Sequence, residues 1–67
     1  MMNRQPVSSS RIRSVGWAGN VMEVEFHDGA VYQYMGVTSS EYRDFLNSSS
    51  LGSALSRLDK QHPYHRV

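Results

Sequence analysis

Two pairs of residues have the types and the spacing to do chemistry. Arg11 and Arg13 stand two apart in a segment that reads as a strand, so both side chains are expected opposite Ile12, where their guanidinium groups could contact phosphates. Tyr32 and Tyr34 have the same spacing in a later strand, and two tyrosines on one face could stack unpaired bases. The chemistry that these pairs indicate is nucleic-acid binding.

Each pair also has a structural interpretation, and the sequence favours it. Arginines on a strand at the border of a sheet discourage edge-to-edge pairing with another molecule. Tyrosine is common in strands, and both rings could pack with Met22 and Val24 while their hydroxyl groups reach the margin of the sheet. The tyrosines are therefore predicted in the core or at its edge.

The C-terminal residues form a basic and aromatic tail. Such a segment could become ordered on binding RNA or an acidic protein, and a frayed terminus is the equal alternative. The candidate nucleic-acid-binding residues are Arg11, Arg13, Tyr32, Tyr34, Lys60, Tyr64 and Arg66.

The sequence predicts no catalytic residue, no metal site and no cofactor. Most serines fall in expected helix caps and linkers, and no nucleophile elbow is present. Pro63 separates His62 from His65 and prevents a regular helical pair of ligands, and no third ligand is evident. A chain this small also has difficulty forming a deep pocket while it keeps a core. We therefore expect a binding protein and not an enzyme.

Length and composition allow one small folding unit. The 67 residues are too few for a second domain, and no cysteine is available for a disulfide, which suits the reducing cytoplasm. No segment is apolar enough for a membrane span or a secretory signal, so a soluble protein is expected. Seven Lys and Arg face six Asp and Glu, but the acids all lie between Glu23 and Asp59, so both ends are basic.

Alternating apolar residues and turn sequences predict three strands. The first is interrupted once between Ile12 and Val15, which indicates a bulge or twist near residues 14–16. The second alternates without a break and is followed by the turn sequence His27-Asp28-Gly29. The predicted strands cover residues 11–17, 21–26 and 30–35.

Two registers of the second hairpin compete. A two-residue turn pairs Phe26 with Val31 and directs both tyrosines to the acidic side of the sheet. A three-residue loop with Gly29 in the left-handed conformation pairs Phe26 with Ala30 and gathers the apolar side chains on one face. We favour the second register. Its further pairs are Val24 with Tyr32, Met22 with Tyr34 and Glu23 with Gln33.

Two short helices follow. Thr38 and Glu41 form a capping box that starts a helix ending near Asn47, and Val37 before the cap is placed for a hydrophobic staple with Tyr42. A second helix carries apolar residues at helical spacing and ends before the proline of the tail. These apolar residues are Leu51, Ala54, Leu55 and Leu58.

The predicted fold is α+β: a three-stranded antiparallel β-meander followed by two short α-helices packed on one face. Residues 1–9 are expected to form a flexible arm, and residues 10–62 a single domain. The tail, residues 63–67, either leaves the domain or folds back over it.

The order and spacing of many elements resemble the KTSC family. The most distinctive is the central tyrosine-x-tyrosine, matched by Tyr32 and Tyr34, and Ser50-x-Gly52 matches the serine-glycine step between the helices. The resemblance covers nearly the whole chain. Its other elements are Ser9-Ser10, Ile12, Val15-Gly16-Trp17, Val24-x-Phe26, Gly29, Gln33, Val37, Tyr42, Leu46 and Tyr64.

The family is named for a segment at the C-terminus of some bacterial lysyl-tRNA synthetases and also occurs as a free-standing bacterial protein of about this length. The resemblance implies no established activity, and the synthetase context suggests RNA binding. The family usually has a lysine between the serine and the glycine, where this chain has Leu51. An anion site built on that lysine is therefore not expected here.

Two functions follow from these observations. The first is an accessory module that binds RNA, mostly through the backbone phosphates and with little sequence selectivity. The alternative is a protein-interaction or self-association module, a monomer or weak dimer, that exposes Trp17, Val31 and Met35 on its sheet.

Overall fold

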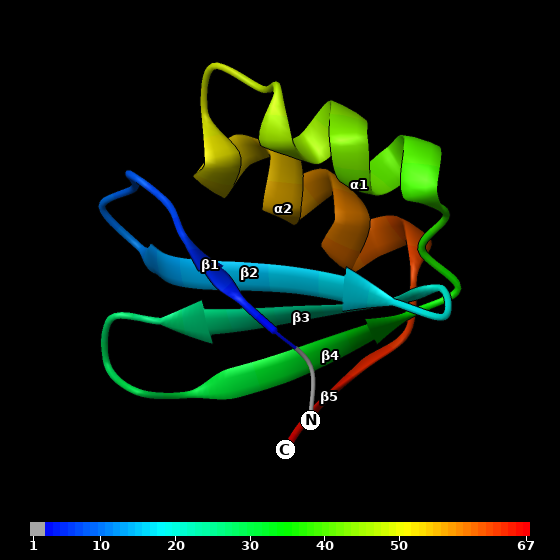
Figure 1. Ribbon diagram of the computed structural model, residues 1–67, viewed down its shortest axis with the longest axis horizontal. Coiled ribbons are helices and arrows are strands. Elements are labelled where there is room, and N and C mark those ends of the chain that lie inside the picture. Colours follow the sequence, from blue (N-terminus) through cyan, green and yellow to red (C-terminus); the bar gives the residue numbers. More distant parts are fainter. Residues whose placement is uncertain (1–2) are drawn as a thin grey trace.

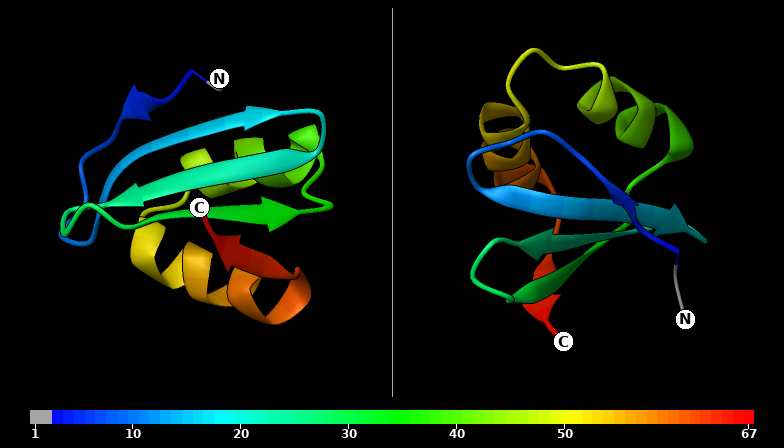
Figure 2. Two further views of the ribbon diagram at one scale, coloured as in Figure 1. Left: turned by 90° about the horizontal axis from the view of Figure 1, so that it is seen from below. Right: turned by 60° about the vertical axis from the view of Figure 1, so that its left-hand side comes forward.

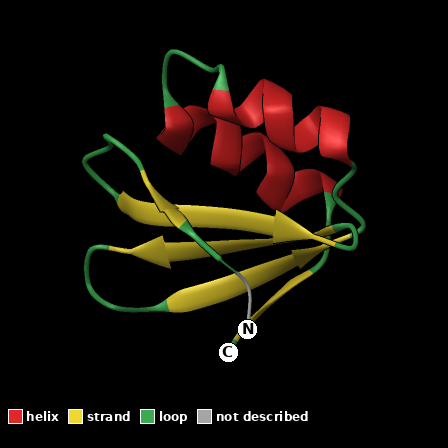
Figure 3. Cartoon of the chain, viewed as in Figure 1, coloured by secondary structure: helices red, strands yellow, loops and turns green. Residues whose placement is uncertain are grey.

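The computed structural model describes residues 3–67 as one antiparallel sheet and two helices (Figure 1). The strands lie side by side in the order β1-β2-β3-β4-β5, and both helices cover one face of the sheet (Figure 3). The predicted α+β class is confirmed, with five strands in place of the three predicted. In chain order the elements are β1 (Gln5–Pro6), β2 (Ile12–Ala18), β3 (Val21–Phe26), β4 (Val31–Met35), α1 (Ser39–Leu46), α2 (Leu51–Gln61) and β5 (Tyr64–Arg66).

The hairpin between β3 and β4 has the favoured three-residue loop. The backbone N–H of Phe26 donates to the carbonyl of Ala30 at 2.9 Å, and Gly29 has a φ of 93°, in the region that favours glycine. The pairs Met22 with Tyr34 and Val24 with Tyr32 are present, as predicted. Both tyrosines therefore point to the face that the helices cover.

The hairpin between β2 and β3 is closed by a two-residue turn. Gly19 and Asn20 both have positive φ, 55° and 63°, which is the geometry of a type I′ turn and matches the twist of the strands. The register of this pair shifts between Ile12 and Ser14, so the predicted bulge is confirmed slightly nearer the start of the strand. The shift lets both Ile12 and Val15 enter the core.

The core lies between the sheet and the helix layer. Alternate residues of the central strands meet Phe45 of α1 and the apolar stripe of α2, as the helical spacing predicted. Removing one such side chain typically costs about 2–5 kcal/mol of stability. The core residues are Ile12, Val15, Met22, Val24, Tyr34, Val37, Phe45, Ala54, Leu55 and Leu58.

The first strand corrects the expectation that no order precedes Ser10. Gln5 pairs with Val15 and Pro6 with Ser14, so β1 lies along the outer edge of β2 (Figure 2, left). The prediction failed because this pairing is made by main-chain groups and needs no apolar side chains. Pro6 also fits an edge strand, where its missing N–H costs no central hydrogen bond.

Asn3 and Arg4 lie over the face of the sheet opposite the helices. Arg4 donates through Nη1 to Oε2 of Glu23 at 2.6 Å, and Gln33 donates to the other oxygen of Glu23 at 2.9 Å. Glu23 is therefore buried with both carboxylate oxygens hydrogen-bonded. A Cβ at position 16 would stand 2.5 Å from the carbonyl oxygen of Asn3, so Gly16 allows this close approach.

The C-terminal tail folds back over the domain, the second of the two predicted alternatives. Tyr64 pairs with Tyr34 and Arg66 with Tyr32, so β5 extends the sheet beside β4. Pro63 ends the helical path, and its carbonyl accepts a hydrogen bond from Met35 N at 2.9 Å. Among the described residues, no helix combines the length and apolar character that a membrane span requires.

We expect Gly16→Ala to destabilise the fold by about 1–3 kcal/mol, because the new methyl group overlaps the backbone of Asn3. Gly52→Ala is the matched control, because a Cβ there would meet Arg11 at an ordinary 3.7 Å and would favour the helix by about 0.5–1 kcal/mol. Urea unfolding of both variants measures the effect. A Gly16 variant as stable as the unmodified protein would contradict the packing of residues 3–4 on the sheet.

Candidate functional site

A groove of about 530 Å³ lies where the β3–β4 turn, β4, β5 and α2 come together. Its volume falls in the range of about 300–1,000 Å³ that is typical of ligand sites. Five of the seven candidate residues line it: Arg11, Tyr32, Tyr34, Tyr64 and Arg66. The other lining residues are Phe26, His27, Asp28, Ala30 and Asp59.

Four aromatic rings form a connected wall in this groove. Phe26 meets Tyr32 edge to face at 5.8 Å between ring centroids, and Tyr64 lies 5.9 Å from Tyr32 and 5.1 Å from Tyr34. These distances are in the range of favourable aromatic pairs. Tyr64 is 50% exposed, Tyr32 is half-buried and Tyr34 is buried. Tyr64 on β5 is therefore the ring that a ligand can reach most easily.

Tyr34 has a structural role at the base of the groove. Its hydroxyl group donates to Oδ1 of Asp59 at 2.6 Å and so ties β4 to α2. Burial, and then the hydrogen bond to the Asp59 carboxylate, raise the pKa of Tyr34 above its ordinary value. The preferred interpretation of the tyrosine pair, core or core edge, is confirmed, and Tyr34 offers no free ring face for stacking.

Charged side chains of both signs surround the aromatic wall. Arg11 and Arg66 supply two cations, and Asp28 and Asp59 supply two anions. Asp28 also holds the turn, because its Oδ1 accepts a hydrogen bond from Ala30 N at 3.0 Å. The groove is formally neutral, so only the two guanidinium groups, and not a net charge, would attract the anionic group of a ligand.

Two candidate residues lie outside the groove. Arg13 is exposed on the bulged part of β2, so the simple alternation that placed it beside Arg11 does not hold. Lys60 is exposed near the end of α2. The five other lining residues were not among the candidates. Phe26 could have been found from the favoured register, whereas no sequence signal brings Asp59 to the tyrosines.

A hollow at the start of α2 includes Leu51, the position at which the family usually has a lysine. It is lined mainly by serines of the segment before β2 and of the first turns of α2, together with Arg11, Leu51 and Gly52. Ser50 caps the helix by accepting from Ser53 N at 3.4 Å. Leu51 supplies no charge there, and Arg11 is the charged side chain among the lining residues.

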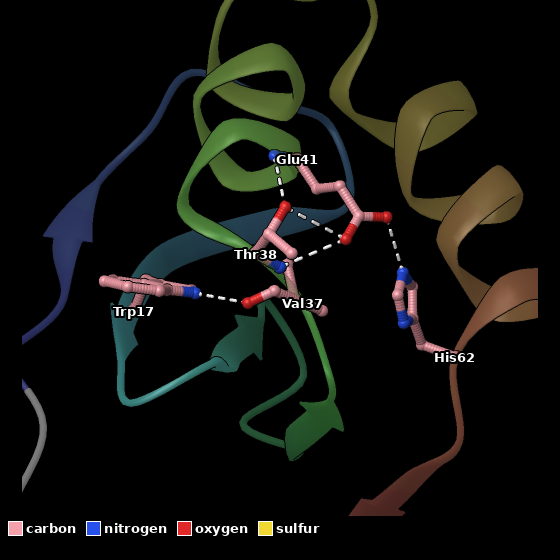
Figure 4. Close-up of polar contacts among 5 residues, drawn as sticks. All are labelled: Trp17, Val37, Thr38, Glu41 and His62. Carbon is pink, nitrogen blue, oxygen red and sulfur yellow. Dashed lines mark hydrogen bonds and ion pairs between the residues drawn. The ribbon is translucent and has the colours of Figure 1, made fainter.

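Thr38, Glu41 and His62 form a polar contact between the two helices (Figure 4). The predicted capping box is confirmed, because Glu41 N donates to Thr38 Oγ1 at 3.2 Å and Thr38 N donates to Glu41 Oε1 at 3.0 Å. His62 Nε2 donates to the other oxygen, Oε2, at 2.8 Å. These contacts, with the Thr38 backbone bond as the largest cause, lower the pKa of Glu41. The start of α1 is thereby joined to the C-cap of α2, two residues before β5.

This cluster does not have the geometry of a catalytic triad. In a triad the histidine stands between the hydroxyl group and the carboxylate. Here Glu41 stands between Thr38 and His62, so the histidine is not hydrogen-bonded to the hydroxyl group that it would have to activate. Within residues 3–67, no group of three or more His, Asp or Glu side chains is arranged to hold a metal ion.

Trp17 lies on the helix-covered face, which corrects the surface expected for the protein-interaction alternative. Its ring is half-buried and stacked on Tyr42, with 6.4 Å between the ring centroids. Figure 4 shows its Nε1 donating to the carbonyl of Val37, at 2.7 Å. The prediction failed because the bulge moves Trp17 onto the face of Met22, its partner in β3. Val31 and Met35 remain on the opposite face, where Met35 is 37% exposed.

Comparison with known proteins gives a consistent result. The family model described as the KTSC domain matches residues 8–64. An uncharacterized protein from Stutzerimonas stutzeri (strain A1501) is 34% identical over 65 residues, which cover 94% of this chain and 92% of that protein. The crystal structure of a KTSC domain protein from Yersinia pestis has a TM-score of 0.90 and 34% identity, covering 100% of this chain and 99% of the other.

We expect Tyr34→Phe to lower the free energy of unfolding by about 1–2 kcal/mol, because it removes the hydrogen bond to Asp59 and leaves the ring in place. Tyr32→Phe is the control, since the Tyr32 hydroxyl group makes no hydrogen bond to another described residue. Urea unfolding compares the two variants. Equal losses would show that the Asp59 contact does not stabilise the fold.

The lowered pKa of Glu41 predicts an acid-sensitive contribution to stability. The contribution is complete above the ordinary glutamate pKa of about 4.3 and is lost as the pH falls through the lower folded value. Glu41→Gln keeps the cap geometry without the charge, so it should be less stable than the unmodified protein at neutral pH, and the difference should shrink in acid. Asp44→Asn, in the same helix, is the control. Thermal melts across this pH range check the expectation, which a constant difference would contradict.

Proposed function

The chain belongs to the KTSC domain family, and we propose that it is an accessory module that binds single-stranded RNA and not an enzyme. The observation that supports this proposal is the groove, which gathers five of the seven candidate residues from β4, β5 and the segment before β2. These residues combine guanidinium groups with an accessible tyrosine ring. That combination is common where proteins hold unpaired nucleotides.

In this proposal the arginines and the exposed tyrosine bind different parts of the RNA. Arg11 and Arg66 contact phosphate oxygens, and Tyr64 offers its exposed ring to a base. Two aspartates balance the two arginines, so the affinity is modest. With about two phosphate contacts, the logarithm of the binding constant should fall with the logarithm of the salt concentration with a slope of about −1.4. An RNA ligand and the cysteine-free sequence both favour the cytoplasm as the compartment.

The alternative proposal is a protein interaction through the sheet face opposite the helices. Val31 and Met35 lie on that face. An apolar contact there would persist in salt and would weaken on changing Met35 to a charged residue. The mass of the protein in solution separates a monomer from a self-associating form.

The test is an amide-resolved NMR titration with mixed-sequence single-stranded RNA at low and moderate salt. We expect shifts at Arg11, Tyr32, Tyr64 and Arg66 that fade as salt rises. Arg11→Ala should weaken binding and reduce the salt slope by about 0.7, the contribution of one phosphate contact. Arg13→Ala removes the same charge outside the groove and is the matched control.

Two outcomes would overturn this proposal. One is the absence of shifts at low salt with millimolar RNA, which would direct the search to protein partners. The other is an equal loss in the Arg11 and Arg13 variants, which would mean that RNA is attracted to surface charge in general and not to the groove.

A further inference from the structure

We propose that the groove is a slot for one unpaired nucleotide, with the base on the Tyr64 ring and the phosphate at the rim formed by Arg11 and Arg66. This inference rests on the proposed RNA binding and defines it more narrowly. The ligand is a single nucleotide, free or within a strand, and not a row of stacked bases.

The burial of the tyrosines limits the number of bases that can stack in the groove. The spacing of Tyr32 and Tyr34 along one strand suggested a platform for successive bases. In the structure Tyr34 is 2% exposed and its hydroxyl group is bound to Asp59, and Tyr32 is half-buried between Phe26 and Tyr64. Tyr64, at 50%, is the one exposed tyrosine of the groove, so the groove offers one accessible tyrosine to a base.

The Tyr64 ring is held in place before any ligand arrives. The main chain on both sides of it is bonded to β4, because Met35 N donates to Pro63 O and Val67 N donates to Val31 O, both at 2.9 Å. The ring also contacts Tyr34 at 5.1 Å between centroids. A ring that is already ordered loses little conformational entropy on binding, which favours even a small ligand.

Both arginines line the groove that holds the Tyr64 ring, so a phosphate attached to a base on that ring has two cations in the same groove. Arg66 pairs with Tyr32 and lies two residues from Tyr64 on β5, so both side chains belong to the same face of that strand. Arg11 borders the same groove from the segment before β2, and its main chain is fixed because His27 N donates to Arg11 O at 3.0 Å. The volume of about 530 Å³ suits a mononucleotide.

The test compares a complete nucleotide with its two parts, using the full chain and NMR titration. AMP should shift the amides of Arg11, Tyr32, Tyr64 and Arg66. Adenosine and ribose 5-phosphate should each bind more weakly, because each supplies only one of the two contacts. Tyr64→Ala should weaken AMP binding roughly tenfold, the usual effect of losing one stacked base, while Tyr64→Trp should keep it. Arg13→Ala is the control and should bind AMP like the unmodified protein.

The outcomes separate this inference from the proposed function. If single-stranded RNA binds, AMP produces no shifts in the groove and Tyr64→Ala leaves RNA binding unchanged, the slot is overturned and the RNA-binding proposal stands. If AMP and ribose 5-phosphate bind equally well, the base is not recognised and the slot is overturned. If neither RNA nor AMP binds, both proposals fall. An unchanged amide spectrum away from the groove verifies that the Tyr64 variants are folded.

Discussion

The three-residue turn between β3 and β4 determines which face of β4 the helices cover. Gly29 adopts a positive φ, the N–H of Phe26 bonds to Ala30, and the tyrosines of β4 thereby lie opposite Met22 and Val24. A shift of one residue would move every side chain of β4 to the other face. Tyr34 could then neither join the core nor reach Asp59, and the aromatic wall of the groove would not form.

The rest of the groove depends on how the chain returns to the sheet. After two helices the chain ends α2 at Gln61, turns at Pro63 and adds β5 to the free edge of β4. His62, the C-cap of α2, donates to Glu41, so the end of α2 is bonded to the capping box of α1. Tyr64 and Arg66 line the groove because the chain returns to the sheet as β5.

Tyr34 and Tyr64 differ in burial and in structural role. Tyr34 is committed to the core, where its hydroxyl group needs a partner and finds Asp59. Tyr64 lies on a three-residue edge strand, contributes less to the core and stays half exposed. The accessible ring therefore comes from the edge of the sheet, where a ligand can approach without disturbing the buried side chains.

Much of the candidate site was predictable from sequence, because arginine and tyrosine reveal their chemistry by type. Five of the seven residues selected in this way line the groove. Arg13 does not, because a β-bulge changes the alternation on which its placement rested. Asp59 was missed because its contact with Tyr34 joins residues 25 apart, and no local pattern encodes such a contact.

The sequence by itself determined the local structure: the three central strands, the Gly29 turn with its register, the Thr38 cap and the apolar stripe of α2. These features follow from side-chain periodicity and from the backbone preferences of single residues, which act over a few neighbours. Only the tertiary structure decided that Gln5–Pro6 and Tyr64–Arg66 become edge strands, that Arg4 bonds to Glu23 and that Trp17 faces α1. The physical reason for the edge strands is that their pairing is made by main-chain hydrogen bonds. Every residue offers a carbonyl and every residue except proline an N–H, so this pairing leaves no signature in the side chains.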